Sequence, residues 1–194
     1  MKPKTLQTRE LYRARNFSLI EQQVKLPTGA LTKVETIRHP GAAAVVPMLS
    51  KSHIVLVRQY RYALGDWVWE IPAGTLFSEE DPKDCAQREL GEETGYEAGY
   101  LQKIGEILPA PAYSDDRVHI FLATNLKRSS QHLEEDEIIE VREFTIIQAL
   151  EMIKTGEIKD TKTIVGILMA NSIMGELSRF EPDRKKNKKI RHKG

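Results

Sequence analysis

Two segments near the N-terminus alternate loosely between apolar and polar residues: FSLIEQQVKL, which starts at residue 17, and TKVETI, which starts at residue 32. Alternation with a period of two is typical of a strand with one covered face. Pro27, Thr28 and Gly29 lie between the segments and are residues that favour turns. The pattern therefore predicts a β-hairpin over residues 17–37.

The clearest helix of the chain follows residue 80. Asp81 is a good N-cap, Pro82 suits the first helical position, and Gly95 suits the position after the last turn. Residues 72–74, Pro-Ala-Gly, predict a turn at the end of a strand. Short apolar or alternating runs predict the strands 42–49, 53–59, 67–71, 101–108, 118–124 and 138–144, and helical patterns predict the helices 146–155 and 161–179.

Strands on both sides of one central helix, followed by two terminal helices, predict an α+β fold. We expect an α/β/α sandwich in which a mixed β-sheet lies between helices, together with an N-terminal antiparallel β-hairpin or sheet. The expected division is a hairpin region over residues 1–40, a catalytic domain over residues 41–180 and a basic, disordered tail over residues 181–194.

Composition narrows the class of protein. The net charge is +1, which favours neither a nucleic acid nor a membrane surface as the partner. No apolar run approaches the roughly 18 residues that a membrane helix needs, and the N-terminus lacks the apolar stretch of a secretory signal. Cys85 is the single cysteine, so a disulfide framework is excluded. We expect a cytoplasmic protein.

The candidate chemistry lies on the central helix. Because a helix turns by about 100° per residue, Glu89, Glu92 and Glu93 fall within an arc of about 100°. Three like charges on one face repel each other, and a divalent cation with oxygen ligands, such as Mg²⁺, would offset the repulsion. Arg88 would neutralise part of the cluster from the side. The alternative is an ordinary solvated acidic face.

The frame around these glutamates resembles the Nudix box. That motif reads Gly, five residues, Glu, seven residues, Arg-Glu, an aliphatic residue, any residue, Glu-Glu, any residue, Gly and an apolar residue. Tyr96 stands where an aliphatic residue is commoner. The matching positions are Gly74, Glu80, Arg88, Glu89, Leu90, Glu92, Glu93, Gly95 and Tyr96.

The resemblance extends to the subgroup of ADP-ribose pyrophosphatases and other nucleoside diphosphate sugar hydrolases. The runs Arg58–Arg61 and Trp69–Gly74 resemble the segment before the box in that subgroup, and Pro111 lies 15 residues after Tyr96, near the subgroup's marker proline. Two residues depart from the pattern, since Ala112 replaces the usual Gly and Asp116 the usual Glu.

This resemblance implies Mg²⁺-dependent hydrolysis of the diphosphate of a nucleoside diphosphate sugar, ADP-ribose first, to a nucleoside monophosphate and a sugar phosphate. Mn²⁺ is the alternative metal. GDP-mannose or a broad range of nucleotide sugars is the alternative substrate, and a triphosphate or a capped RNA a further one. A non-catalytic Nudix binding module is the alternative from another class of protein, although such modules usually lose glutamates of the box.

The resemblance also implies roles for individual residues. Metal would be held by Glu89, Glu93 and the carbonyl of Ala73, with Glu92 and Arg88 assisting. The substrate-binding residues would be Arg58 or Arg61 on a phosphate, Glu70 on the ribose or a water, and the segment that contains Pro111 and Asp116. The general base would come from the acidic loop after the box, residues 133–140, with Glu137 and Glu140 favoured over Glu135.

Two expectations concern partners. The subgroup often uses its N-terminal strands to cross to a second subunit, so the hairpin region implies a homodimer. The basic tail, Arg184–Lys193, raises the alternative of RNA or membrane-surface binding through phosphate attraction. It contains no aromatic residue for stacking on bases, which favours a solubilising role.

Overall fold

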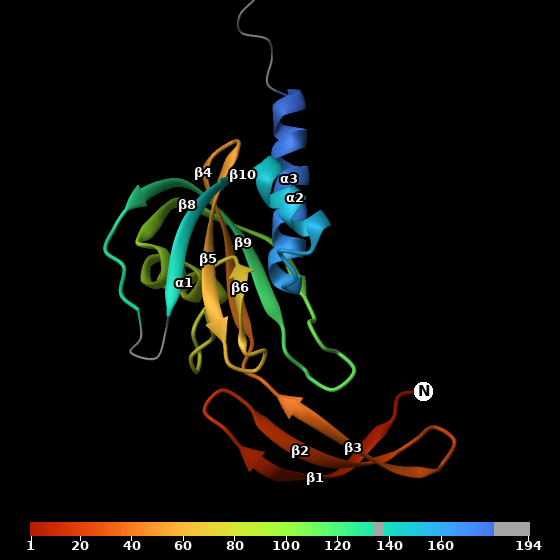
Figure 1. The fold of residues 1–194 in the computed structure, drawn as a ribbon. Helices are drawn as coiled ribbons and strands as arrows, with labels where there is room; N and C mark the ends of the chain where they lie inside the picture. Colours follow the sequence, from red (N-terminus) through yellow and green to blue (C-terminus); the bar gives the residue numbers. More distant parts are fainter. Residues whose placement is uncertain (134–137, 181–194) are drawn as a thin grey trace, which may run out of the picture.

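The structure is a computed structural model that describes residues 1–133 and 138–180. It contains a three-stranded sheet near the N-terminus and a seven-stranded sheet that carries the helices (Figure 1). The division of the chain at residue 40 into separately folding parts stays a prediction. The basic tail expected over residues 181–194 lies outside the described residues.

The N-terminal sheet has the order β1-β2-β3 and consists of β1 (Lys4–Arg13), β2 (Ser18–Lys25) and β3 (Leu31–Arg38). β2 and β3 form the predicted hairpin, and the turn between them contains Gly29 at a φ of 89°. β1 adds a third antiparallel strand along β2, so the expected N-terminal antiparallel sheet is confirmed. All ten residues of β1 are exposed, so no buried apolar face marked this strand in the sequence.

The second sheet has the order β10-β5-β4-β9-β8, and two short strands lie off this path, because β6 pairs with β5 and β7 pairs with β4. β4 pairs with β9 in parallel and the other pairs are antiparallel, so the expected mixed sheet is confirmed. The strands of this sheet are β4 (Ala42–Ser50), β5 (His53–Arg61), β6 (Asp66–Glu70), β7 (Ala73–Thr75), β8 (Tyr96–Ile107), β9 (Val118–Arg128) and β10 (Ile139–Thr145).

Helices cover both faces of this sheet, as expected for the sandwich. α1 (Pro82–Thr94) lies on one face, and α2 (Ile146–Thr155) and α3 (Thr161–Phe180) lie on the other (Figure 1). Because successive side chains of a strand point to opposite faces, β5 serves both layers. Val55 packs with Leu90 of α1, whereas Ile54 and Leu56 belong to the cluster under α2 and α3.

The central helix has the predicted caps. The Asp81 carboxylate accepts a hydrogen bond from the backbone N–H of Lys83 at 2.7 Å, and Pro82 opens the helix. Gly95 ends it in the left-handed conformation, with a φ of 67°. These contacts satisfy backbone groups that a helix end leaves without partners, so α1 begins and ends where the sequence indicated.

The predicted turn at residues 72–74 was partly wrong. Ala73 and Gly74 lie in β7, which pairs with β4 through Ala44 and Ala43. The backbone N–H of Val45 also donates to the carbonyl of Pro72 at 2.9 Å. Cross-strand hydrogen bonds, which the local sequence does not specify, therefore hold this segment extended along the start of β4.

The loop between β8 and β9 joins the two sheets. The backbone N–H of Ile37 in β3 donates to the carbonyl of Tyr113 at 2.8 Å, and Asp115 returns a hydrogen bond to Ile37 at 3.1 Å. Arg38 also forms an ion pair with Asp115 at 2.6 Å. The end of β3 is thereby fixed to residues 108–117.

None of the helices in the described part of the chain has the length and apolar character that crossing a membrane requires.

Candidate active site

The glutamates of α1 differ in burial. Glu93 is 2% exposed and Glu89 is 8% exposed, whereas Glu92 lies further out, with its side chain 39% exposed. A buried carboxylate is costly unless a cation or hydrogen bonds compensate its charge. Two buried carboxylates one helical turn apart therefore do not fit the alternative of a solvated acidic face.

Arg88 binds three carboxylates at once. Its guanidinium donates to Glu80 at 2.9 Å, to Glu89 at 2.6 Å and to Glu92 at 3.0 Å. Burial alone would lower the pKa of Arg88, but the hydrogen bonds to these glutamates outweigh burial and raise the pKa above its usual range. Arg88 therefore stays charged and neutralises the outer side of the cluster.

Residues of β7 pack directly against the buried carboxylates. A Cβ atom placed on Gly74 would come within 1.8 Å of Glu89 Oε1, so this position leaves no room for a side chain. The backbone N–H of Ala73 donates to Glu93 Oε2 at 3.3 Å. The structure thus brings together Ala73, Glu89 and Glu93, the three residues that the resemblance assigned to metal.

Strand register separates the two candidate arginines. Arg61 shares a face of β5 with Val55, which packs against α1, whereas Arg58 lies on the opposite face. Hydrogen bonds to Glu70 are the main cause of the raised pKa of Arg61, and the charge of Glu93 adds to it. Arg61 therefore lies within electrostatic range of the glutamate cluster.

Arg58 has different neighbours. It pairs across the sheet with Trp69 on β6 and with Glu140 on β10. Its guanidinium carbon lies 5.5 Å from the ring centre of Trp67 and 5.8 Å from that of Trp69. These contacts place Arg58 on the face that α2 and α3 cover.

Glu70 is 3% exposed, and both of its oxygens have partners within the chain. Arg61 donates to them at 2.7 and 2.6 Å, and Lys162 of α3 also contacts Oε2. Burial alone would raise the pKa of Glu70, but the hydrogen bonds of Arg61 and the charge of Lys162 outweigh it and hold the pKa below its usual value. Glu70 is thus an ionised carboxylate at the end of β6.

The acidic loop starts beside the end of α1. The side chain of Gln131 donates to the carbonyl of Glu93 at 2.7 Å, and the backbone N–H of His132 donates to the carbonyl of Glu92 at 3.0 Å. Glu135 and Glu137 lie outside the described residues.

Glu140 is placed away from the cluster. It stands opposite Arg58 in the β5–β10 register, and its neighbour Val141 is the residue that packs toward α1. Its carboxylate contacts Arg142 and lies 3.9 Å from Arg58. Of the loop candidates, Glu140 therefore lies on the opposite face of the sheet from Glu89 and Glu93.

Pro111 and Asp116 lie in the loop at the junction with β3. Pro111 is exposed, and Asp116 Oδ1 lies 2.9 Å from Nδ1 of His39, in the linker after β3. The same ring nitrogen accepts a hydrogen bond from the backbone N–H of Gly41 at 3.1 Å. The contacts of this segment are thus with the linker between the two sheets.

The donor set suits a hard divalent cation. Among residues 1–133 and 138–180, no three acidic, histidine or cysteine side chains form a ready-made cage for a metal. Mg²⁺ commonly uses one or two carboxylates and completes its shell with water and substrate phosphates. Two buried glutamates packed against the Ala73–Gly74 backbone match that coordination, and Arg88 forms ion pairs with Glu80 and Glu89.

Sequence reasoning missed the residues at the start of α3. Lys162 contacts Glu70, and the hydroxyl of Thr163 accepts a hydrogen bond from the backbone N–H of Ile71 at 2.9 Å. In both pairs the partners are 92 residues apart in the sequence. Asp160 carried the only local signal, as an acidic residue placed to cap a helix.

Comparison with known proteins agrees with this geometry. The NUDIX domain profile matches residues 38–164. An ADP-ribose pyrophosphatase of Bacillus subtilis is 38% identical over 169 residues, which cover 86% of this chain and 91% of the relative. A methanol dehydrogenase activator of Bacillus methanolicus is 39% identical over 166 residues, covering 84% and 90%.

A GDP-mannose pyrophosphatase of Escherichia coli is 37% identical over 149 residues, which cover 68% of this chain and 77% of the relative. A solved structure described as an ADP compounds hydrolase superposes with a TM-score of 0.81 at 20% identity, over 92% of this chain and 97% of that one. That likeness concerns the fold. The profile match across most of the chain, together with relatives above 30% identity, shows that this protein belongs to the NUDIX family.

Proposed function

We propose that this protein is a divalent-metal-dependent pyrophosphohydrolase that cleaves nucleoside diphosphate sugars, with ADP-ribose as the first substrate. The products would be a nucleoside monophosphate and a sugar phosphate. The observation that carries the proposal is the pair of buried carboxylates, Glu89 and Glu93, packed against Ala73 and Gly74. Relatives named for ADP-ribose and GDP-mannose hydrolysis support the substrate class.

Glu89, Glu93 and the carbonyl of Ala73 would hold the metal, with Glu92 at the outer side. The metal, Mg²⁺ first and Mn²⁺ as the alternative, would neutralise phosphate charge and lower the pKa of a bound water. Arg88 holds the carboxylates of Glu89 and Glu92 in place through hydrogen bonds. A cytoplasmic location and a role for Pro111 and Asp116 in binding substrate stay predictions from the sequence.

Arg61, rather than Arg58, is the proposed phosphate partner. A charge-assisted hydrogen bond is worth about 1.5–3 kcal/mol, so Arg61→Ala should lower kcat/KM for ADP-ribose by about 10–10²-fold. Arg58→Ala is the matched control, because Arg58 lies on the other face of the sheet. This variant should change kcat/KM for ADP-ribose by less than about threefold. Steady-state kinetics with melting curves for both variants measure this, and a larger loss in Arg58→Ala would contradict the assignment.

The general base is proposed to be Glu137 or Glu135. Removal of a general base typically costs 10²–10⁴-fold, so Glu137→Gln or Glu135→Gln should lower kcat by at least about 10²-fold. Glu140→Gln should stay near the wild-type rate, because its carboxylate lies on the other face. If all three variants keep kcat within about tenfold of the wild type, the acidic loop does not supply the base.

The N-terminal sheet is the proposed homodimer interface. It exposes apolar side chains that a second subunit would cover, and an exposed apolar surface of this kind marks interaction sites. Light scattering at micromolar concentration should give twice the chain mass, and a monomer would refute the proposal. The exposed apolar residues are Leu6, Leu11, Tyr12, Phe17, Leu31 and Val34.

A substrate panel tests the function as a whole. The purified chain would be incubated with Mg²⁺ and ADP-ribose, GDP-mannose, ADP-glucose, NADH, ATP or a capped dinucleotide, with and without EDTA. Ion-exchange chromatography should show AMP and ribose phosphate from ADP-ribose, and EDTA should stop their formation. A preference for ATP or the cap would replace the nucleotide-sugar assignment, and no turnover at all would favour a binding module.

A further inference from the structure

A closed ring of polar contacts ties the start of α3 to the end of β6. Lys162 contacts Oε2 of Glu70 and also lies 3.1 Å from Asp160 Oδ2. The same Asp160 oxygen accepts hydrogen bonds from the Thr163 backbone N–H at 2.9 Å and from its hydroxyl at 2.6 Å. The Thr163 hydroxyl oxygen accepts from the backbone N–H of Ile71 at 2.9 Å, which closes the ring at the residue next to Glu70.

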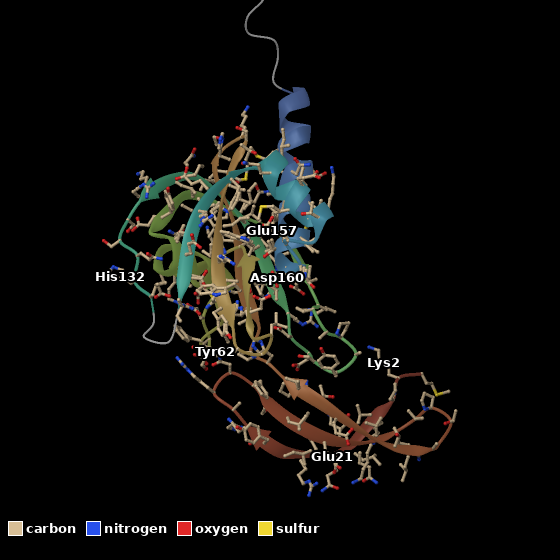
Figure 2. The ribbon with its side chains drawn as sticks, viewed as in Figure 1. Lys2, Glu21, Tyr62, His132, Glu157 and Asp160 are labelled. Atoms are coloured by element: carbon tan, nitrogen blue, oxygen red, sulfur yellow. The ribbon has the colours of Figure 1, made fainter. Side chains whose placement is uncertain are left out.

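The ring is largely buried, so its members have few alternative partners. Thr163 and Ile71 are fully buried, and the side chain of Lys162 is 15% exposed. A buried polar group that loses its partner costs about 1–3 kcal/mol, which favours this single arrangement. Figure 2 shows the labelled Asp160 near the start of α3, beside the strands of the main sheet.

The ring holds one end of the segment that reaches the glutamate cluster. Glu70 and Ile71 lie in the ring, and Ala73 and Gly74, only two or three residues further on, contact Glu93 and Glu89. Pro72 lies between them, and its ring fixes one backbone torsion. The position of the Ala73 carbonyl therefore depends on where α3 holds Glu70 and Ile71.

Arg61 couples the same ring to the phosphate side of the site. It shares the carboxylate of Glu70 with Lys162, and the charges of Glu93 and Asp160 both act on it. Without Lys162, Arg61 would be the sole cation left on a buried carboxylate and would be held there more strongly. Lys162 thus affects the position of residues 71–74, and it affects how strongly Glu70 holds Arg61 away from a phosphate.

We propose that Lys162, through Glu70 and through the hydrogen bonds between Asp160 and Thr163, is a positioning residue that sets the position of the Ala73–Gly74 backbone against Glu89 and Glu93. It would not touch the substrate. Partners beyond the direct ligands of a metal typically change metal affinity or activity by 10–100-fold when removed. The inference rests on the proposed metal-dependent function, but metal binding tests it without any substrate.

The test compares Lys162→Met, Lys162→Arg, Glu70→Gln and the double variant Glu70→Gln/Lys162→Met with the wild type. Lys154→Met is the matched control, because Lys154 is an exposed lysine of α2 that forms a surface ion pair with Glu151. Electron paramagnetic resonance of free Mn²⁺ gives the dissociation constant for each chain. Circular dichroism and melting curves establish that each variant is folded, and kcat and KM for ADP-ribose are measured separately.

We expect Lys162→Met to weaken Mn²⁺ binding by about tenfold or more and to lower kcat more than it changes KM. Lys162→Arg should keep the Mn²⁺ affinity and kcat within about threefold of the wild type, and Lys154→Met should match the wild type. Because Glu70 and Lys162 act together, the losses in Mn²⁺ affinity and in kcat that the single variants cause should not add up in the double variant.

A folded Lys162→Met chain with wild-type Mn²⁺ affinity and kcat would overturn the inference, even if its melting temperature fell. If Lys162→Met does not fold, the double variant, which removes both buried charges, replaces it in the test. Wild-type Mn²⁺ affinity in the folded double variant would overturn the inference equally. If the wild type binds Mn²⁺ but leaves ADP-ribose intact, the proposed function fails and the binding data still decide the role of Lys162.

Discussion

Glu93→Gln should lower kcat for ADP-ribose by well over about 10²-fold, because even partners outside the direct ligands of a metal cost 10–100-fold. Glu93 is 2% exposed and its carboxylate lies against the Ala73 backbone. Glutamine keeps the shape but removes the charge that would hold a cation. The loss should fall on kcat, measured by steady-state kinetics at saturating Mg²⁺.

The same variant should separate metal binding from folding. A ligand that binds only the folded state stabilises it by about 2.7 kcal/mol at 100 times its Kd, so Mg²⁺ should raise the melting temperature of the wild type but not of Glu93→Gln. Glu151→Gln, which alters an exposed carboxylate on α2, is the control and should behave like the wild type. A kcat within tenfold of the wild type in Glu93→Gln would remove this residue from the metal site.

Gly74→Ala is expected to disable the site while leaving the fold in place. The added Cβ would come within 1.8 Å of Glu89 Oε1, and the atom that must move is the end of a flexible side chain. The cost in free energy of unfolding should therefore stay at or below the roughly 1–3 kcal/mol typical of overpacking. Displacing a reacting group by about 1 Å can cost 10²-fold, so kcat should fall by about that factor.

Gly175→Ala is the matched control for this substitution. Nothing lies within 4 Å of a Cβ at Gly175, and the position is helical. Alanine should stabilise α3 by roughly 0.5–1 kcal/mol and leave kcat unchanged. Chemical denaturation and kinetics on both variants measure the two effects. A Gly74→Ala chain with normal kcat and normal Mn²⁺ affinity would show that Glu89 does not need its observed position.

Features that depend on neighbours in the sequence were predictable. The ends of α1 follow from Asp81, Pro82 and Gly95, because caps act within one turn of the helix. The arc of Glu89, Glu92 and Glu93 follows from the helical period, since 3.6 residues per turn is a local property. Both features needed only residues within the box, and the resemblance to the Nudix motif uses that same local information.

Features that depend on pairing were not predictable. β1 has no buried residue, so only its hydrogen bonds to β2 make it a strand. Residues 73–75 contain a turn-favouring glycine and became a strand because β4 pairs with them. The local conformational preferences of these residues do not indicate a strand in either segment. Cross-strand hydrogen bonds override such preferences.

The helix caps, the alternation of the strands and the glutamate arc follow from residues close together in the sequence, and the box motif indicates the family. In contrast, tertiary packing places Arg61 and not Arg58 on the face that α1 covers, places Glu140 on the opposite face, and brings Lys162 to Glu70. Alternation sets which residues of one strand lie together, but not which face meets a given helix. Strand order and helix packing choose that face, through contacts between residues far apart in the chain.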